Sequence, residues 1–125
     1  MASETQSVSL KRAYETPEAS DGTRVLVERL WPRGLTKERA HISVWLKDIA
    51  PSQELRKWYN HDPARFAEFR RRYEEELATE PARSALVDLR ELTKRDHVTL
   101  VFATHDVELS NAAVLRDLLA GAAHQ

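Results

Sequence analysis

Apolar residues follow a strand-like pattern in three parts of the chain. Residues 98–103 form an almost unbroken run of apolar and β-branched side chains, which is typical of a strand buried on both faces of a parallel sheet. Residues 24–30 carry a similar run, and residues 8–14 carry a shorter one. The pattern therefore predicts three strands, with the last of them at the centre of the sheet.

Helical spacing dominates the rest of the chain. Apolar side chains recur every three or four residues over 62–78, 81–94 and the segment after residue 106, and a shorter helix is predicted over 52–60. Gly121 is expected to close the last helix. Residues that favour helix starts precede each predicted helix and one short turn: Thr36, Ser52, Asp62, Pro81 and Asp106.

One segment fits two structures. Residues 42–49 alternate as in a strand, but their apolar residues also fit one face of a helix, and we expect an irregular or helical segment. The order of strand, helices, strand and helix predicts an α/β fold with a small, mainly parallel sheet flanked by helices. All 125 residues are expected to form a single domain, with flexible tails at 1–7 and 121–125.

Composition narrows the class of protein. Hydrophobic residues make up 42% of the chain and charged residues 31%, and the mean hydropathy of −0.57 favours a soluble globular domain without a membrane segment. The absence of cysteine excludes disulfides and thiolate metal sites. Because residues 1–9 lack the apolar core of a signal peptide, we expect a cytoplasmic protein.

Charge is unevenly distributed along the chain. The net charge is −1, yet residues 24–57 hold eight basic and four acidic side chains, a local charge of +4 that leaves −5 for the remainder. A basic region on a nearly neutral domain suits a small anionic ligand better than a long polyanion, so we expect a small anion and not a nucleic acid as the partner.

The ends of two predicted strands bring candidate chemistry together. If strands 24–30 and 98–103 are parallel neighbours, Arg29, Arg33, His105 and Asp106 meet on one rim, where parallel sheets bind ligands. Two arginines four residues apart suit a phosphate or carboxylate, and Gly34 lets the backbone approach it. The alternative is structural: Arg29 pairs with a nearby carboxylate, and Trp31 is a core residue.

Four strings of residues carry a family resemblance: RAYE at 12–15, DGTRVLVERLWPRGL at 21–35, WLKDIAPS at 45–52 and HDPA at 61–64. They resemble the YeaO-like family, a bacterial group of unknown function, over about residues 8–119. The resemblance implies functional roles for residues in each string and near the C-terminus: Arg29, Trp31, Arg33, Gly34, Lys47, Asp48, Ser52, His61, Asp106 and Asn111. Family members often have a histidine near position 110, where this chain has Ser110.

Two of these residues could move a proton. Asp106 could act as a general base or could simply cap a helix, and His61 could transfer protons or bond the backbone. The histidines lack the spacing of metal ligands, and the chain has no phosphate loop, dinucleotide-binding glycine pattern or nucleophile elbow. We therefore predict no metal and no cofactor.

Three functions are compatible with these features of the sequence. The favoured one is a small-anion or nucleotide-like ligand-binding domain or a small enzyme, in which Arg29 and Arg33 clamp the anion and Asp106 or His61 moves a proton. A nucleic-acid-binding regulator is the second, although its best recognition helix, 65–72, spends one face on phenylalanines and precedes three glutamates. A structural or homodimerisation domain built around the tryptophans is the third.

Overall fold

The computed structural model describes residues 8–122, whose strands form one four-stranded sheet. The strands are β1 (Val8–Arg12), β2 (Thr23–Leu26), β3 (Val44–Trp45) and β4 (Val98–Phe102). Their order across the sheet is β1-β4-β2-β3, and every neighbouring pair is parallel. The predicted α/β class and the central position of the last strand are confirmed.

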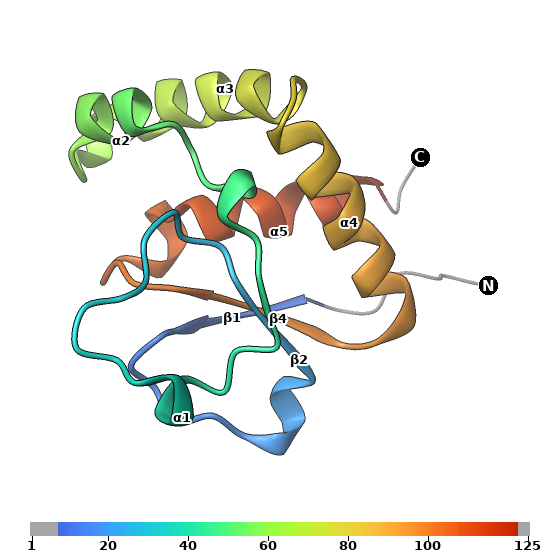
Figure 1. Ribbon diagram of the computed structural model, residues 1–125. Helices are drawn as coiled ribbons and strands as arrows, with labels where there is room; N and C mark the ends of the chain where they lie inside the picture. The colour runs from blue at the N-terminus through green and yellow to red at the C-terminus, as the bar shows by residue number, and fades with distance from the viewer. Residues whose placement is uncertain (1–7, 123–125) are drawn as a thin grey trace.

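Helices cover the two faces of the sheet unequally. They are α1 (Lys37–Ala40), α2 (Gln53–Tyr59), α3 (Phe66–Leu77), α4 (Ala82–Arg95) and α5 (Asn111–Ala122). Figure 1 shows α2 to α5 on one side of the sheet and the short α1 on the other. The larger core therefore lies under the four long helices.

Alternation along β4 divides the core into two parts. Val98, Leu100 and Phe102 belong to the main cluster with the helices, while Val101 belongs to a small cluster on the opposite face. All five β4 side chains are almost fully buried, as the unbroken apolar run predicted. Burial of each large apolar side chain stabilises the fold by about 1.5–3 kcal/mol.

The second face is covered by loop rather than by long helices. Segment 27–43, which follows β2, packs Trp31, Leu35 and Ile42 over this face of the sheet. The rings of Trp31 and Trp45 meet edge to face, with centroids 5.5 Å apart. The tryptophan of the RLWPRG string is thus half-buried in a small core.

Three predicted helix caps are confirmed. Thr36, Ser52 and Asp62 each accept a hydrogen bond from a backbone N–H two or three residues later, at 3.0–3.1 Å. Capping depends on residues adjacent in sequence, which is why it could be predicted without tertiary information.

Strand β2 is shorter than predicted because, beyond its end, backbone groups form hydrogen bonds with side chains and not with the neighbouring strand. Val27 N–H still donates to Val101 O at 3.0 Å. The next backbone groups bond to side chains: the Glu28 carboxylate accepts from Ala103 N–H at 2.9 Å, and Asn111 Nδ2 donates to Val27 O at 2.9 Å. The sequence predicted a strand to residue 30, but these side-chain bonds end it at Leu26.

The last helix begins later than predicted. Asp106 precedes a 3-10 turn (Val107–Leu109) and makes no side-chain cap, so the prediction that it caps the final helix is wrong. Ser110 takes that place, because its Oγ accepts from Ala113 N–H at 3.1 Å. Gly121 lies inside α5, which runs to Ala122, so it does not close the helix as predicted.

Segment 42–49, expected to be irregular or helical, contains the two-residue strand β3 and a 3-10 turn (Lys47–Ile49). Of the expected tails, residues 1–7 and 123–125 lie outside the described residues, and Gly121 and Ala122 are the last two residues of α5. Between residues 8 and 122, no helix has the length and apolar character needed to cross a membrane.

Candidate functional site

After β2 and after β4, the chain turns toward opposite faces of the sheet. These strands are parallel neighbours, with Thr23 paired to Val98 and Leu26 to Val101. Beyond β4 the chain forms α5 on the main-core face, whereas beyond β2 segment 27–43 covers the other face. In open parallel sheets, ligands bind beyond the carboxyl ends of two neighbouring strands whose following segments cover opposite faces.

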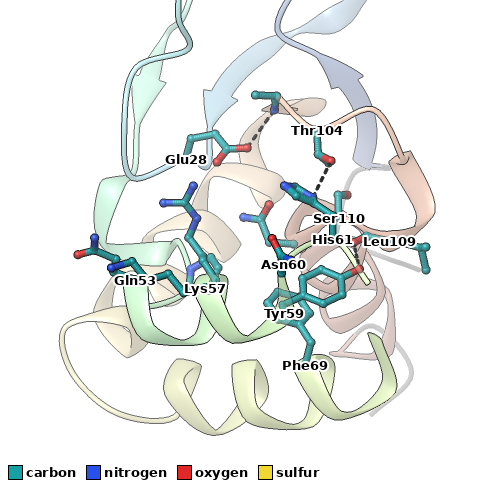
Figure 2. Close-up of a pocket in the computed structure, with 14 residues that line it drawn as sticks. Glu28, Gln53, Lys57, Tyr59, Asn60, His61, Phe69, Thr104, Leu109 and Ser110 are labelled. Carbon is teal, nitrogen blue, oxygen red and sulfur yellow. Dashed lines mark hydrogen bonds between the residues drawn. The ribbon is translucent and has the colours of Figure 1, made fainter. Parts of the chain in front are cut away.

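A pocket of about 520 Å³ opens at this place (Figure 2). Helix α2 and the turn after it form one side, and the residues following β2 and β4 form the other. The lining combines charged, amide, hydroxyl and aromatic side chains: Glu28, Pro51, Gln53, Arg56, Lys57, Tyr59, Asn60, His61, Phe69, Ala103, Thr104, Leu109, Ser110 and Asn111.

Glu28 is the acidic group in this lining. Its Oε2 accepts from Ala103 N–H, which fixes the carboxylate at the end of β4. Burial raises the pKa of Glu28 above its ordinary value, although the Ala103 N–H and the charges of Arg56 and His61 act in the opposite direction. A carboxyl group with a raised pKa in a pocket is a candidate functional group.

Helix α2 supplies the cations. Gln53, Arg56, Lys57 and Asn60 follow the i, i+3, i+4, i+7 spacing of one helix face, and all four line the pocket. Leu55 lies outside the lining and is buried in the main core, and Tyr59 is buried in the same core while also bordering the pocket. The amphipathic pattern of this short helix therefore aims its polar face at the pocket.

Arg56 and Lys57 differ from the arginines of α3. Arg70, Arg71 and Arg72 each form an ion pair with a carboxylate. Among residues 8–122, the side chains of Arg56 and Lys57 form no hydrogen bond or ion pair. Their charges are therefore available to a ligand in the pocket.

His61 follows α2 in an unusual conformation. Asn60 and His61 are both left-handed, with φ of 47° and 55°. Asparagine often ends a helix in this way, but a second left-handed residue of another type stores conformational strain of a kind that gathers at functional sites. The backbone here places His61 Nδ1 3.4 Å from Thr104 Oγ1.

Several residues predicted from the sequence lie in or beside the pocket. His61 and Asn111 line it, and His105 and Asp106 line an adjoining hollow of about 320 Å³ that also includes His61. Arg29 donates to Ala50 O at 3.0 Å and to Pro51 O at 3.4 Å, not to a carboxylate. Because Pro51 lines the pocket, these hydrogen bonds from Arg29 help to hold the lining in position.

Other predicted residues lie elsewhere. Trp31 donates to Leu35 O beneath the second face, where Arg33 is exposed and Gly34 borders a different hollow. Lys47 and Asp48 are exposed beside β3, with the Lys47 ammonium 4.2 Å from the centre of the Trp45 ring. The structure thus distributes the predicted ligand residues over three surfaces.

Sequence reasoning missed Glu28, Arg56 and Lys57 as site residues. Glu28 was counted as part of a strand predicted to run to residue 30. The signal for α2 was present, because its polar residues share one helix face, but which surface that face meets depends on contacts tens of residues away. Within residues 8–122, no three acidic or histidine side chains are grouped so that they could hold a metal ion.

The fold and pocket together define a small parallel α/β domain with an open, mixed-charge pocket at the carboxyl ends of its central strands. Comparison with known proteins gives the family. The chain belongs to the family described as the inactive DUF488-N3 subclade, whose model matches residues 7–125.

Similar proteins occur in other bacteria. The chain is 51% identical over 114 residues to uncharacterized proteins of Mycobacterium tuberculosis and Mycobacterium bovis, covering 91% of this chain and 94% of each relative. It is 38% identical over 112 residues to the uncharacterized protein YeaO of Escherichia coli K12, covering 90% and 96%. The resemblance to a YeaO-like family is confirmed. No solved structure matches the chain significantly.

Proposed function

We propose that this chain binds a small anionic, nucleotide-like ligand in the pocket between α2 and the ends of β2 and β4. The observation that supports this most strongly is the pair of unpartnered cations, Arg56 and Lys57, on the pocket wall. A guanidinium group offers two parallel N–H donors to phosphate, and a lysine adds a point charge. The pocket volume of about 520 Å³ falls in the range of small-molecule sites.

The anion is placed at α2 and not at the RLWPRG string. Arg29, one of the two expected clamps, already donates to the carbonyls of Ala50 and Pro51. Arg33, the other, is exposed and is not part of the pocket lining. Arg29 then contributes to binding indirectly, because it holds Pro51 in the pocket lining. Arg56 and Lys57 bind the anion, the role that the sequence assigned to Arg29 and Arg33.

The proposal is for binding without chemical turnover. The matching family is described as an inactive subclade, which favours a binding role. Asp106 is exposed, and His61 has Thr104 as its hydrogen-bonding neighbour at 3.4 Å, a long distance for an oriented catalytic base. An enzyme remains the second candidate, because His61 and Asp106 border the same small hollow. A time course of AMP with the protein, followed by ³¹P NMR, separates the two.

The other two functions have less support. On α3, the arginines that a nucleic acid would need are already paired with acidic side chains, for example Arg71 and Arg72 with Glu68. Phe69 is 2% exposed, so one face of this helix is occupied by the core. A homodimer is compatible with ligand binding and has no specific observation in its favour.

The first test is a thermal-shift measurement with AMP and with inorganic phosphate. Saturating ligand, at about 100 times its Kd, stabilises the folded state by about 2.7 kcal/mol, which corresponds to a rise in Tm on the order of 10 °C. We expect this rise in the wild type and its loss in Arg56→Gln, because the substitution removes the guanidinium that holds the anion.

Two control variants make this test specific. Arg95→Gln removes a similar charge from the end of α4, beside the amino end of β4 and away from the pocket, so the shift should be retained. Arg33→Ala should also retain it. A shift that is lost in Arg33→Ala and kept in Arg56→Gln would return the site to the RLWPRG string, and the absence of any shift with either anion would contradict the proposal.

A further inference from the structure

Glu28 places a negative charge in a pocket that is proposed to bind an anion. One of its oxygens, Oε2, accepts from Ala103 N–H at 2.9 Å. The other oxygen, Oε1, has no hydrogen-bond partner within residues 8–122, and it is not among the fully buried unpartnered atoms of that range. Figure 2 shows the carboxylate facing the pocket opposite α2. An acceptor is therefore available to a ligand.

A carboxylate beside a bound anion needs a hydrogen-bond donor for its free oxygen, because its negative charge otherwise repels the anion. The dianion of a phosphate monoester carries only acceptors, so a simple ester such as methyl phosphate at Arg56 would leave Oε1 without a donor and would repel its charge. A ligand that carries a hydrogen-bond donor beside its phosphate supplies the missing donor, and this hydrogen bond offsets part of the repulsion. The pocket therefore favours a phosphate ester whose organic group carries a hydrogen-bond donor over an ester without one.

The neighbours of Glu28 also restrict the donor. Arg56 and His61 line the same pocket as Glu28, and both act to lower the pKa of its carboxyl group, so both groups lie close to it. A ligand ammonium group in this place would be repelled by the charge of Arg56, whereas a neutral hydroxyl would not be. The same closeness requires a short separation between the phosphate and the donor of the ligand.

We propose, on the basis of the proposed function above, that Glu28 determines specificity by accepting a hydrogen bond from a hydroxyl of a ribosyl phosphate held at Arg56 and Lys57. The position of Glu28 supports this assignment, since it follows the end of β2 by two residues. In doubly wound nucleotide-binding folds, an acidic side chain hydrogen-bonds a ribose hydroxyl. Asn60, Thr104 and Asn111 line the same pocket and can bond the remaining hydroxyls.

The test compares ribose 5-phosphate with methyl phosphate, which has the same anionic group and no hydroxyl donor on its carbon. Isothermal titration calorimetry on the wild type should give at least about a tenfold preference for ribose 5-phosphate, the discrimination expected from one hydrogen bond to a charged group. In Glu28→Leu the preference should fall to near one. Affinity for methyl phosphate should be unchanged or higher in this variant, because a repelling charge is removed.

Glu28→Gln provides a second variant that retains an acceptor oxygen and the bond to Ala103. Its preference should be intermediate, since hydrogen bonds to neutral acceptors are about half as strong as those to charged ones. If Glu28→Leu does not fold, as judged by circular dichroism, a reduced preference in Glu28→Gln decides the question.

The possible failures are distinguishable. Equal affinities of the wild type for the two ligands, lost together in Arg56→Gln, would overturn the role of Glu28 and leave the anion site intact. A preference that persists unchanged in the Glu28 variants would also overturn it, because another group would then bind the hydroxyl. Failure of the wild type to bind either ligand would overturn this inference together with the proposed function.

Discussion

Asp21→Ala is expected to lower the free energy of unfolding by about 3–5 kcal/mol, the usual cost of leaving one member of a buried ion pair without its partner. Asp21 and Arg24 are 6% and 3% exposed, and Arg24 Nη1 donates to Asp21 Oδ2 at 2.6 Å. Lys11 Nζ donates to Asp21 Oδ1 at 2.9 Å. The substitution strands the Arg24 guanidinium, whose Nη2 already lacks a partner among residues 8–122.

Urea denaturation of wild type and variant measures this loss. Glu68→Ala is the matched control, because Glu68 also joins two basic side chains, Arg71 and Arg72, but does so on the exposed surface of α3. Solvent screens such pairs, so the control should change stability little. A loss for Asp21→Ala no larger than that of the control would show that Arg24 finds other partners when Asp21 is removed.

The pH dependence of stability gives an independent check on Asp21. Burial acts to raise the pKa of Asp21, but hydrogen bonds from Lys11, the Glu18 N–H and Arg24 outweigh it and lower the pKa below its ordinary value. A carboxyl group whose pKa is lower in the folded state contributes stability above its unfolded pKa, about 3.9, and loses it as the pH falls through the folded value.

The wild type should therefore exceed Asp21→Asn in stability by a constant amount between about pH 5 and 7, and this difference should narrow below about pH 4. Urea titrations at several pH values measure it. A difference that stayed constant down to about pH 2 would mean that the ionised carboxylate is not what stabilises this region.

Gly22→Ala is expected to cost about 3 kcal/mol, the sum of backbone strain and overpacking. Gly22 has φ of 65° and ψ of −134°, a combination that residues with a Cβ rarely adopt. A Cβ at this position would lie 2.2 Å from the carbonyl oxygen of His97. That carbonyl cannot easily retreat, because it accepts from Thr23 N–H at 2.9 Å beside the start of β2.

Gly34→Ala separates the two contributions. Gly34 also has a positive φ, 77°, but a Cβ there would meet no described atom within 4 Å. The expected cost is therefore the strain alone, about 1 kcal/mol. Equal losses of stability for the two variants in urea denaturation would show that the close approach of Gly22 to His97 is not present in solution.

The sequence predicted elements best where neighbouring residues decide the structure. The run over 98–103 became the buried strand β4, and Thr36, Ser52 and Asp62 became caps. Prediction was wrong where a distant group intervened. Asn111, 84 residues away, bonds the carbonyl of Val27 and helps to end β2 before residue 30. The predicted cap of α5 was wrong for a local reason, because a 3-10 turn follows Asp106 and Ser110 caps the helix.

The candidate site could be located approximately but not assembled. Its place at the ends of the strands after residues 26 and 102 follows from the rule for parallel sheets. The choice of its cations did not follow, because arginines look alike in sequence. Arg29 donates to the carbonyls of Ala50 and Pro51, and Arg71 pairs with Glu68 and Glu75. The side chain of Arg56 forms no hydrogen bond or ion pair with a described group.

By itself, the sequence determined the α/β class, the central strand, three of the helix starts and the family, since periodicity, capping and family similarity are all properties of local strings of residues. The tertiary structure alone decided which charges remain free and where they meet. Glu28 meets Ala103 across 75 positions, and Arg56 faces Glu28 from a separate helix. Contacts over such separations depend on how the whole chain packs.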